Sequence, residues 1–208
     1  RRLVNVVKAA WPSAAPGTQA YSSAPKPTVS RPWESDPVRF VVVGLGMGHN
    51  RSRTVVETPG TRLVGVCDVV EERAKRSAEA FGVPYSLDVQ EWLENDQVEV
   101  VYVLTETGRH AEIAIRALEA GKHVISTKPM EASLAACDGM IRAAEANGRL
   151  LAVDFGRRFG SSLLDLKAAV AAGDLGRPLG ATFNLKIQRT MEYFRSNGGW
   201  RGTRRWDG

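Results

Sequence analysis

Three glycines and an aspartate, which follow two short apolar runs, are the residues whose types and spacing most clearly indicate a binding site. Gly44, Gly46 and Gly48 follow residues 39–43, which are apolar apart from Arg39. Glycines at such a turn let the backbone approach a pyrophosphate closely, and the N-terminus of a following helix attracts its negative charge. Asp68 lies 22 residues beyond Gly46, where a carboxylate can accept hydrogen bonds from a ribose. The spacing predicts a dinucleotide site, and a plain turn is the alternative for the glycines taken alone.

The turn departs from the strict dinucleotide pattern at one position. The pattern has its third glycine at position 49, but this residue is His49, and Gly48 comes one place early. Met47 lies within the turn, so we expect it beside the bound cofactor together with the glycines. The context supports the site despite the departure, because an expected buried strand precedes the turn, a helix follows it, and Asp68 ends the next strand.

Asp68 also bears on which dinucleotide binds. Its carboxylate would accept hydrogen bonds from both ribose hydroxyls of NAD and would repel the 2′-phosphate of NADP. Val69 follows, where an NADP site would more often have arginine or serine. Arg73 could still reach a phosphate, and a solvated helix arginine is the alternative. The sequence therefore favours NAD over NADP.

Two polar segments are expected at the carboxyl ends of later strands, the edge at which open α/β sheets bind ligands. Thr105 follows the apolar residues 98–103, and we expect it beside the cofactor. His110 opens the next helix, where it either contacts the ligand or packs near the positive end of the helix dipole. Lys128 follows residues 123–126 and precedes a proline. A lysine there can donate to a substrate hydroxyl and take part in proton transfer, and a surface lysine before a turn is the alternative.

These residues require elements that place them at one edge of a sheet. From residue 38 to residue 155, short apolar runs alternate with helix-like segments, and the connections are too long for hairpins. This alternation predicts an α/β fold, a doubly wound parallel sheet with helices on both faces. The expected strands are residues 39–43, 63–67, 98–103, 123–126 and 150–153, and the expected helices are 71–81, 89–93, one that ends at Gly121, and one capped by Ser133 with a buried stripe of Leu134, Cys137, Ile141 and Ala144.

The segments on either side of this unit differ from it in composition. Residues 1–37 are rich in proline, serine and alanine without a helix or strand period, which predicts a flexible arm. Residues 156–208 contain an expected helix, 163–172, and an alternating segment, 179–187, that predicts a strand with one exposed face. Because a single strand cannot stand alone, we expect residues 156–208 to begin a second, sheet-containing domain.

Composition argues against several other classes of protein. The chain has a net charge of +5, but residues 38–155 carry −4 and the basic excess lies in the two flanks, so nucleic acid is not the expected partner. No apolar run is long enough to span a membrane. Cys67 and Cys137 are expected to be small buried residues, without a disulfide framework or a metal site. We expect a cytoplasmic protein, and the opening Arg1-Arg2 leaves periplasmic export as the alternative.

Several segments together resemble a known family. They are Val43-Gly44-Leu45-Gly46, Asp68, residues 110–124, Lys128-Pro129-Met130, Arg157-Arg158-Phe159, Gly173-Asp174-Leu175-Gly176 and Trp200-Arg201-Gly202. In this order and spacing they are similar to the glucose–fructose oxidoreductase, inositol dehydrogenase and rhizopine-catabolism (Gfo/Idh/MocA) family. The resemblance covers residues 38–208, and the stretch from the helix to the Lys-Pro pair is its most specific part.

The resemblance implies a two-domain enzyme. A Rossmann domain, residues 38–155, would hold NAD(P), and an α/β domain with an open, mainly antiparallel sheet would build the sugar or polyol site and the interface of a homo-oligomer. Lys128 would match the lysine of the family's Glu-Lys-Pro motif, which positions the substrate and relays a proton. Thr105, His110 and Lys128 would lie along the cofactor, and Trp200 and Arg201 near its nicotinamide end.

The chain also departs from the family pattern. Thr127 replaces the usual glutamate before the lysine, and Glu106-Thr107 replaces a Pro-Asn pair. The family's glycine-rich segment with its catalytic aspartate and histidine is expected just after Gly208, so we expect the chain to stop within its second domain.

The preferred interpretation is an oxidoreductase that transfers a hydride between the nicotinamide and a hydroxyl-bearing carbon of a sugar, inositol or related polyol. Two alternatives remain. One is a glycosidase of the same family that uses bound NAD for transient oxidation. The other is a nucleotide-binding fragment or regulator without turnover.

Overall fold

The computed structural model describes residues 36–207 of the chain. The expected flexible arm, apart from its last two residues, lies outside these described residues, and so does the Arg1-Arg2 pair. None of the described helices is long and apolar enough to cross a membrane.

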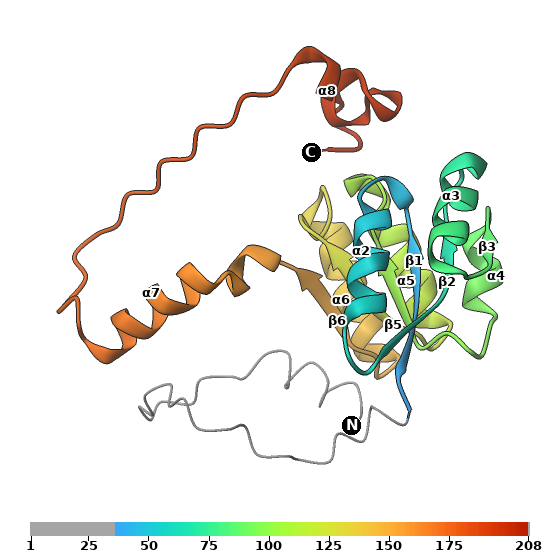
Figure 1. Cartoon of the computed structure of the whole chain (residues 1–208), viewed down its shortest axis with the longest axis horizontal. Coiled ribbons are helices and arrows are strands. Elements are labelled where there is room, and N and C mark those ends of the chain that lie inside the picture. Colours follow the sequence, from blue (N-terminus) through green and yellow to red (C-terminus); the bar gives the residue numbers. More distant parts are fainter. Residues whose placement is uncertain (1–35, 208) are drawn as a thin grey trace.

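A parallel sheet of six strands forms the centre of the fold (Figure 1). The strand order β3-β2-β1-β4-β5-β6 is the doubly wound order in which two halves run outward from β1 and β4. The predicted parallel sheet is therefore confirmed, although β4 begins two residues later than expected. Strand β3 was not predicted, because its two residues are too few to show the alternating pattern of a strand. The strands are β1 (Val38–Val43), β2 (Thr61–Cys67), β3 (Tyr85–Ser86), β4 (Val100–Val103), β5 (His123–Thr127) and β6 (Leu151–Asp154).

Helices cover both faces of this sheet. One face carries α2 (Leu45–Glu57) and α3 (Glu71–Phe81), and the other carries α4 (Val89–Leu93), α5 (His110–Glu119) and α6 (Leu134–Ala146). The bounds of α3 and α4 match the prediction. As expected, α3 ends at Gly82 in a left-handed conformation, and the Ser133 side chain caps α6 by accepting a hydrogen bond from the Ala136 amide.

Strand β1 shows why both faces need helices. Val41 and Val43 pack in the cluster with α5 and α6, whereas Phe40 and Val42 pack in the cluster with α2 and α3. All four side chains are buried. A continuous apolar run is thus consistent with a central strand. Because β1 pairs in parallel with β2 and β4, the carboxyl ends of these strands lie at one edge of the sheet.

The predicted buried stripe of α6 is only partly correct. Ala144 is buried, but Leu134 and Ile141 are exposed, and Cys137 is half-buried. The core instead receives Met140, which is fully buried. The helix carries two overlapping apolar stripes at helical spacing, so periodicity alone does not show which of them faces the sheet.

The C-terminal flank contains helices but no strand among its described residues. Helix α7 (Ser161–Ala172) ends at Gly173 as expected, and it projects away from the sheet in Figure 1. The predicted strand 179–187 is wrong, because this segment is extended but pairs with no other strand in residues 36–207. Alternating hydrophobicity marks a segment that can join a sheet, whereas a strand also requires a hydrogen-bonding neighbour. The antiparallel sheet of a second domain stays a prediction.

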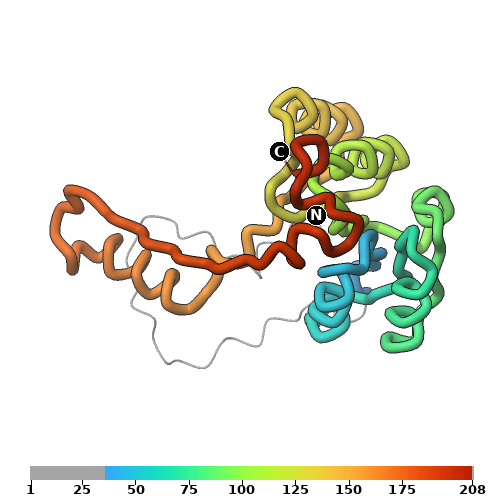
Figure 2. Tube along the Cα trace, turned by 90° about the horizontal axis from the view of Figure 1, so that it is seen from above, coloured from blue at the N-terminus to red at the C-terminus, as the bar shows by residue number. Residues whose placement is uncertain are grey.

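The end of the described chain returns to the parallel sheet. It contains α8 (Met191–Arg195) and the short 3-10 segment η4 (Asn197–Gly202), neither of which was predicted. Figures 1 and 2 show this segment above the carboxyl edge of the sheet. The amide of Gly108 donates a 3.1 Å hydrogen bond to the carbonyl of Trp206, which fastens the segment to the loop after β4.

Candidate functional site

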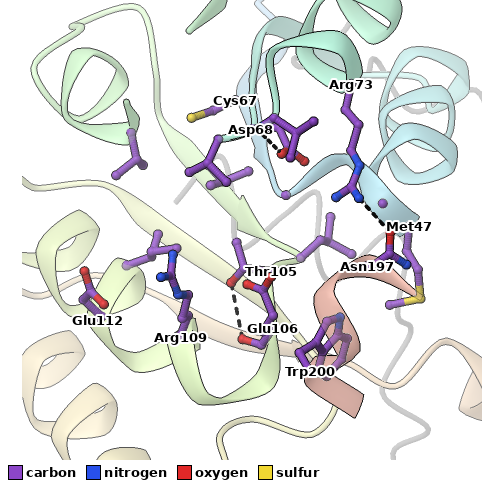
Figure 3. A pocket seen from close by; sticks show the side chains of 18 of the residues that line it. Met47, Cys67, Asp68, Arg73, Thr105, Glu106, Arg109, Glu112, Asn197 and Trp200 are labelled. Carbon is purple, nitrogen blue, oxygen red and sulfur yellow. Dashed lines mark hydrogen bonds between the residues drawn. The ribbon is translucent and has the colours of Figure 1, made fainter. Parts of the chain in front are cut away.

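A cavity of about 500 Å³ opens at the carboxyl edge of the sheet, beside the junction of β1 and β4 (Figure 3). In doubly wound sheets this junction is the point at which ligands bind. The walls come from the segments that follow β1, β2 and β4, and from the returning residues 197–201. The predicted site residues that line this cavity are Gly44, Gly46, Met47, Asp68, Thr105, Trp200 and Arg201.

The first two glycines of the turn have different physical roles. Gly44 has a φ of 89°, and a Cβ there would lie 2.7 Å from the backbone of Leu104. Gly44 therefore allows the turn after β1 to press against the end of β4. Apart from the adjoining residues and the backbone of α2 itself, no atom of the described chain lies within 4 Å of a Cβ at Gly46, which lines the cavity. The open space at Gly46 is what a pyrophosphate on the N-terminus of α2 requires.

Gly48 performs the packing role of the third glycine one residue early. It is buried and lines neither this cavity nor its neighbour described below, and a Cβ there would lie 3.1 Å from Val42 Cγ1. The glycine thus lets α2 lie close to β1. His49, at the usual position of that glycine, is directed elsewhere, because its Nδ1 lies 3.0 Å from the hydroxyl of Ser77 on α3.

Asp68 connects the glycine turn to the end of β2. Its Oδ2 accepts a 2.7 Å hydrogen bond from the amide of Leu45, and its Oδ1 accepts a 2.8 Å hydrogen bond from the amide of Val70. The residue is 6% exposed and lines the cavity. A carboxylate has about four lone-pair positions, so each oxygen retains capacity to accept a further hydrogen bond from a hydroxyl.

The returning C-terminal segment closes one side of the cavity. Arg73 on α3 donates a 2.7 Å hydrogen bond to the side-chain oxygen of Asn197, 124 residues later. Figure 3 shows Asn197 and Trp200 facing the residues that follow β1 and β4. The guanidinium of Arg201 lies 4.5 Å from the ring centroid of Trp200, a cation–π contact that orders both side chains.

The thiol of Cys67 also lines the cavity, at the end of β2. Burial, followed by the neighbouring carboxylate of Asp68, raises the pKa of Cys67 to about 12. The side chain therefore remains a neutral thiol at physiological pH, consistent with the predicted small buried residue and not with a nucleophile.

Lys128 lies in a second cavity of about 630 Å³, which shares Met47 and Leu104 with the first. Lys128 was expected along the cofactor, but it lines this second cavity and not the first. Among the remaining lining residues are four on the ends of β5 and β6 or beyond, namely Thr127, Asp154, Arg157 and Arg158. The second cavity thus adjoins the first at the edge where a substrate would meet a bound dinucleotide.

An ion pair lies in the wall of this second cavity, and a phenol outside the lining contacts it. Arg51 on α2 lies 3.0 Å from Asp154, and the Tyr102 hydroxyl donates a 2.5 Å hydrogen bond to the same carboxylate. Burial, followed by the hydrogen bond to Asp154, raises the pKa of Tyr102 above its usual value, so the phenol remains a donor. Both contacts are to Oδ2 of Asp154, and together they hold this carboxylate in place.

His110 lines neither cavity, and the structure supports the packing alternative. It is 1% exposed. Its Nδ1 lies 3.1 Å from the carbonyl oxygen of Pro129 and 3.2 Å from that of Met130, and its Nε2 lies 3.1 Å from the carbonyl oxygen of Thr105. The imidazole therefore joins the loop after β4 to the loop that carries Lys128, a positioning role.

Two side-chain contacts at the site gave no signal in the sequence. The contact between Arg73 and Asn197 and the pair of Arg51 and Asp154 join residues that are far apart in the chain, so no local pattern reports them. Within residues 36–207, no group of three or more histidine, cysteine, aspartate or glutamate side chains has an arrangement that could hold a metal ion.

The first cavity fits a dinucleotide. It combines three features: open space at Gly46 on the N-terminus of α2, the capacity of Asp68 to accept further hydrogen bonds, and a volume within the range of cofactor sites. The N-terminus of α2 at Gly46 would hold the pyrophosphate, and Asp68 would hold the ribose next to it.

Comparison with known proteins agrees with this geometry. The family model described as "Oxidoreductase family, NAD-binding Rossmann fold" (GFO_IDH_MocA) matches residues 38–155. The scyllo-inositol 2-dehydrogenase (NAD(+)) of Bacillus subtilis is 33% identical over 145 residues, 68% of this chain and 42% of that protein. The inositol 2-dehydrogenase of Salmonella typhimurium is 33% identical over 144 residues, 66% of this chain and 43% of that protein.

Solved structures give the same result for the fold. The WlbA dehydrogenase of Bordetella pertussis, in complex with NADH and UDP-GlcNAcA, is 29% identical, with a TM-score of 0.77 over 83% of this chain and 50% of that chain. The chain spans half or less of the length of these relatives. Because the family model covers more than half of the chain, and covers the segment that forms the sheet and the glycine turn, the chain belongs to the Gfo/Idh/MocA family of oxidoreductases with an NAD-binding Rossmann fold.

Proposed function

We propose that this chain binds NAD in the first cavity and acts in the transfer of a hydride between the nicotinamide and a hydroxyl-bearing carbon of a sugar, inositol or related polyol. The observation that carries the proposal is the open space at Gly46 beside the free acceptor capacity of Asp68 in one cavity. NAD is favoured over NADP because the Asp68 carboxylate would repel a 2′-phosphate.

The residues of the first cavity would bind and orient the cofactor. The amides at the N-terminus of α2 would donate to the pyrophosphate, and Asp68 would accept from the adenosine ribose. Thr105, Trp200 and Arg201, on the opposite wall, would position the nicotinamide half. When bound, NAD supplies a hydride acceptor or donor, which no protein side chain provides.

The second cavity would bind the substrate. Lys128 has no acid partner among the described residues, so its ammonium is available to donate to a substrate hydroxyl and to relay its proton. The inositol dehydrogenases among the relatives, and the WlbA dehydrogenase with its bound UDP-GlcNAcA, support a hydroxylated ring as substrate. A cytoplasmic location and a homo-oligomer remain predictions from the sequence analysis.

One observation favours a second candidate function, a dinucleotide-binding protein without turnover. Within residues 36–207, none of His49, His110 and His123 lines either cavity. Lys128 is then the one described side chain with an evident role in proton transfer at the substrate side.

The two candidates are separated by measuring binding and turnover on the same preparation. NAD⁺ binding is followed by calorimetry, and NADH formation is followed by absorbance with a panel of inositols, sugars and sugar acids. An oxidoreductase gives both signals, and Lys128→Ala lowers NADH formation by about 10²-fold or more while NAD⁺ affinity is retained. Binding without NADH formation favours the non-catalytic candidate. Failure of a folded chain to bind NAD⁺ contradicts both.

A further inference from the structure

We propose that the second cavity recognises an anionic group, a carboxylate or a phosphate, on a sugar or cyclitol ring. This inference rests on the proposed function, because it takes the second cavity as the substrate site. The observation behind it is the distribution of charge in that cavity. Its lining includes four basic side chains and a single acidic one, namely Arg51, Lys128, Arg157, Arg158 and Asp154.

The single acid is already neutralised. Asp154 pairs with Arg51 at 3.0 Å and accepts the hydrogen bond of Tyr102. No ion pair joins Lys128, Arg157 or Arg158 to an acid in the described part of the chain. Three exposed positive charges without an acid partner therefore line the same cavity, and together they make its potential positive, which attracts an anion.

The hydrogen-bonding character of the lining points the same way. The lysine and the three arginines of the lining only donate, whereas Asn50, Thr127 and Asp154 can also accept. A carboxylate or phosphate only accepts, so it matches this excess of charged donors better than a neutral polyol, whose hydroxyls also donate. The guanidinium groups of Arg157 and Arg158, which both line the cavity, suit planar or multidentate anions, because each can donate two parallel hydrogen bonds.

The first cavity shows that this positive excess is local. Its lining has equal numbers of acidic and basic side chains, namely Asp68, Asp88, Glu106 and Glu112 against Arg73, Arg109, Arg116 and Arg201. The excess is thus confined to the side where the substrate would lie. An anionic group bound by Arg157 and Arg158 would place the rest of the ring toward Lys128 and the shared residue Met47.

Calorimetric titration of the chain tests the proposal, with and without saturating NAD⁺. The ligands are glucose, glucuronate, glucose 6-phosphate and inorganic phosphate, so that the carboxylate and phosphate sources are separated. We expect at least one anionic sugar to bind about tenfold or more tightly than glucose, an advantage equal to one charge-assisted hydrogen bond. That advantage should decrease as the salt concentration rises.

Variants assign the effect to the cavity. The double variant Arg157→Gln/Arg158→Gln should remove the preference for the anionic sugar, and Arg157→Lys/Arg158→Lys should retain part of it because the charges remain. Arg62→Gln is the matched control, since Arg62 is an exposed arginine at the amino end of β2, the opposite edge of the sheet. This control should leave the preference unchanged.

Each contrary outcome overturns the inference. Equal affinity for glucose and both anionic sugars, or no binding of any of them, shows that the cavity does not recognise an anionic sugar. Inorganic phosphate that binds as tightly as glucose 6-phosphate shows a site for free anions only. Loss of the preference in Arg62→Gln shows a general charge effect. The proposed function fails separately, if NAD⁺ itself does not bind.

Discussion

The amide of Leu45 donates a 2.7 Å hydrogen bond to the carboxylate of Asp68. One acidic side chain thus joins the first turn of α2, where a pyrophosphate would bind, to the end of β2, where a ribose would bind. The same carboxylate accepts from the amide of Val70, so it supports the local backbone as well as the cofactor site. Substitution of Asp68 is therefore expected to change both stability and cofactor choice.

Asp68→Asn should weaken NAD⁺ binding and reduce the preference for NAD⁺ over NADP⁺. The amide retains one acceptor oxygen but loses the charge that repels a 2′-phosphate, and one of the two backbone amides loses its acceptor. We expect a loss of about 1–3 kcal/mol in the free energy of unfolding, the cost of an unsatisfied buried donor. Urea denaturation and parallel titrations with NAD⁺ and NADP⁺ check these effects. An unchanged ratio of the two affinities would argue against a role of Asp68 in cofactor choice.

Gly44→Ala and Gly46→Ala form a matched pair with opposite expected effects. The alanine Cβ at position 44 would lie 2.7 Å from the Leu104 backbone at a φ of 89°, so this variant should lose about 1–3 kcal/mol or more of stability. At position 46 the added Cβ meets no atom within 4 Å in the described chain beyond its neighbours and the backbone of α2, so the variant should keep its stability and still bind NAD⁺ less tightly. Thermal denaturation and calorimetry separate the two effects. Unimpaired NAD⁺ binding by Gly46→Ala would remove this glycine from the proposed pyrophosphate site.

His123 should make the stability of the chain depend on pH. Burial, followed by the charge of Arg149, lowers the pKa of His123 in the folded state, and its Nδ1 accepts a 2.9 Å hydrogen bond from the amide of Leu150. The folded state thus favours the neutral ring, while the unfolded chain titrates near a pKa of about 6.5. Its contribution is fully present above that pH and is lost as the pH falls through the lower folded-state pKa.

The measurement is urea denaturation between neutral and mildly acidic pH, with His123→Asn as the control. Asparagine offers an acceptor oxygen near the position of Nδ1 but does not titrate in this range. The variant should show a smaller loss of stability on acidification than the natural sequence. Identical pH profiles would show that His123 does not contribute to the acid dependence.

The two cysteines should differ in their reaction with iodoacetamide. Cys67 is buried, and its raised pKa of about 12 leaves almost no thiolate, whereas Cys137 is half-buried on α6. Mass spectrometry of the folded chain should therefore find alkylation at Cys137 first, with Cys67 labelled only after denaturation. Equal rates at both positions in the folded chain would contradict the burial of Cys67 beneath the cofactor cavity.

The sequence was sufficient where local physics determines the structure. Helix α3 was predicted with its bounds because Gly82 marks its left-handed end, and β1 because an apolar run buried on both faces suits a central parallel strand. Residues 179–187 show the limit. Their alternation is compatible with a strand, but whether a neighbouring strand exists depends on residues elsewhere in the chain.

For the site, too, the sequence predicted the local features but not the contacts between distant segments. Gly44, Gly46 and Asp68 follow strands at recognisable spacings, and the structure brings them to one cavity. The approach of Asn197 to Arg73 depends on the path of the chain beyond α7, which no local pattern encodes. Likewise, no local pattern shows that Lys128 lines a second cavity, which shares Met47 and Leu104 with the first.

The most direct test is calorimetric titration of the chain with NAD⁺ and NADP⁺, alongside Asp68→Ala. We predict saturable binding of NAD⁺, with NADP⁺ and the variant each weaker by about tenfold or more, equivalent to about 1.4 kcal/mol. If circular dichroism shows that the chain is folded and it still binds neither dinucleotide, the account is contradicted. The glycine turn would then have a structural role only, and the cavity beside it would not be a cofactor site.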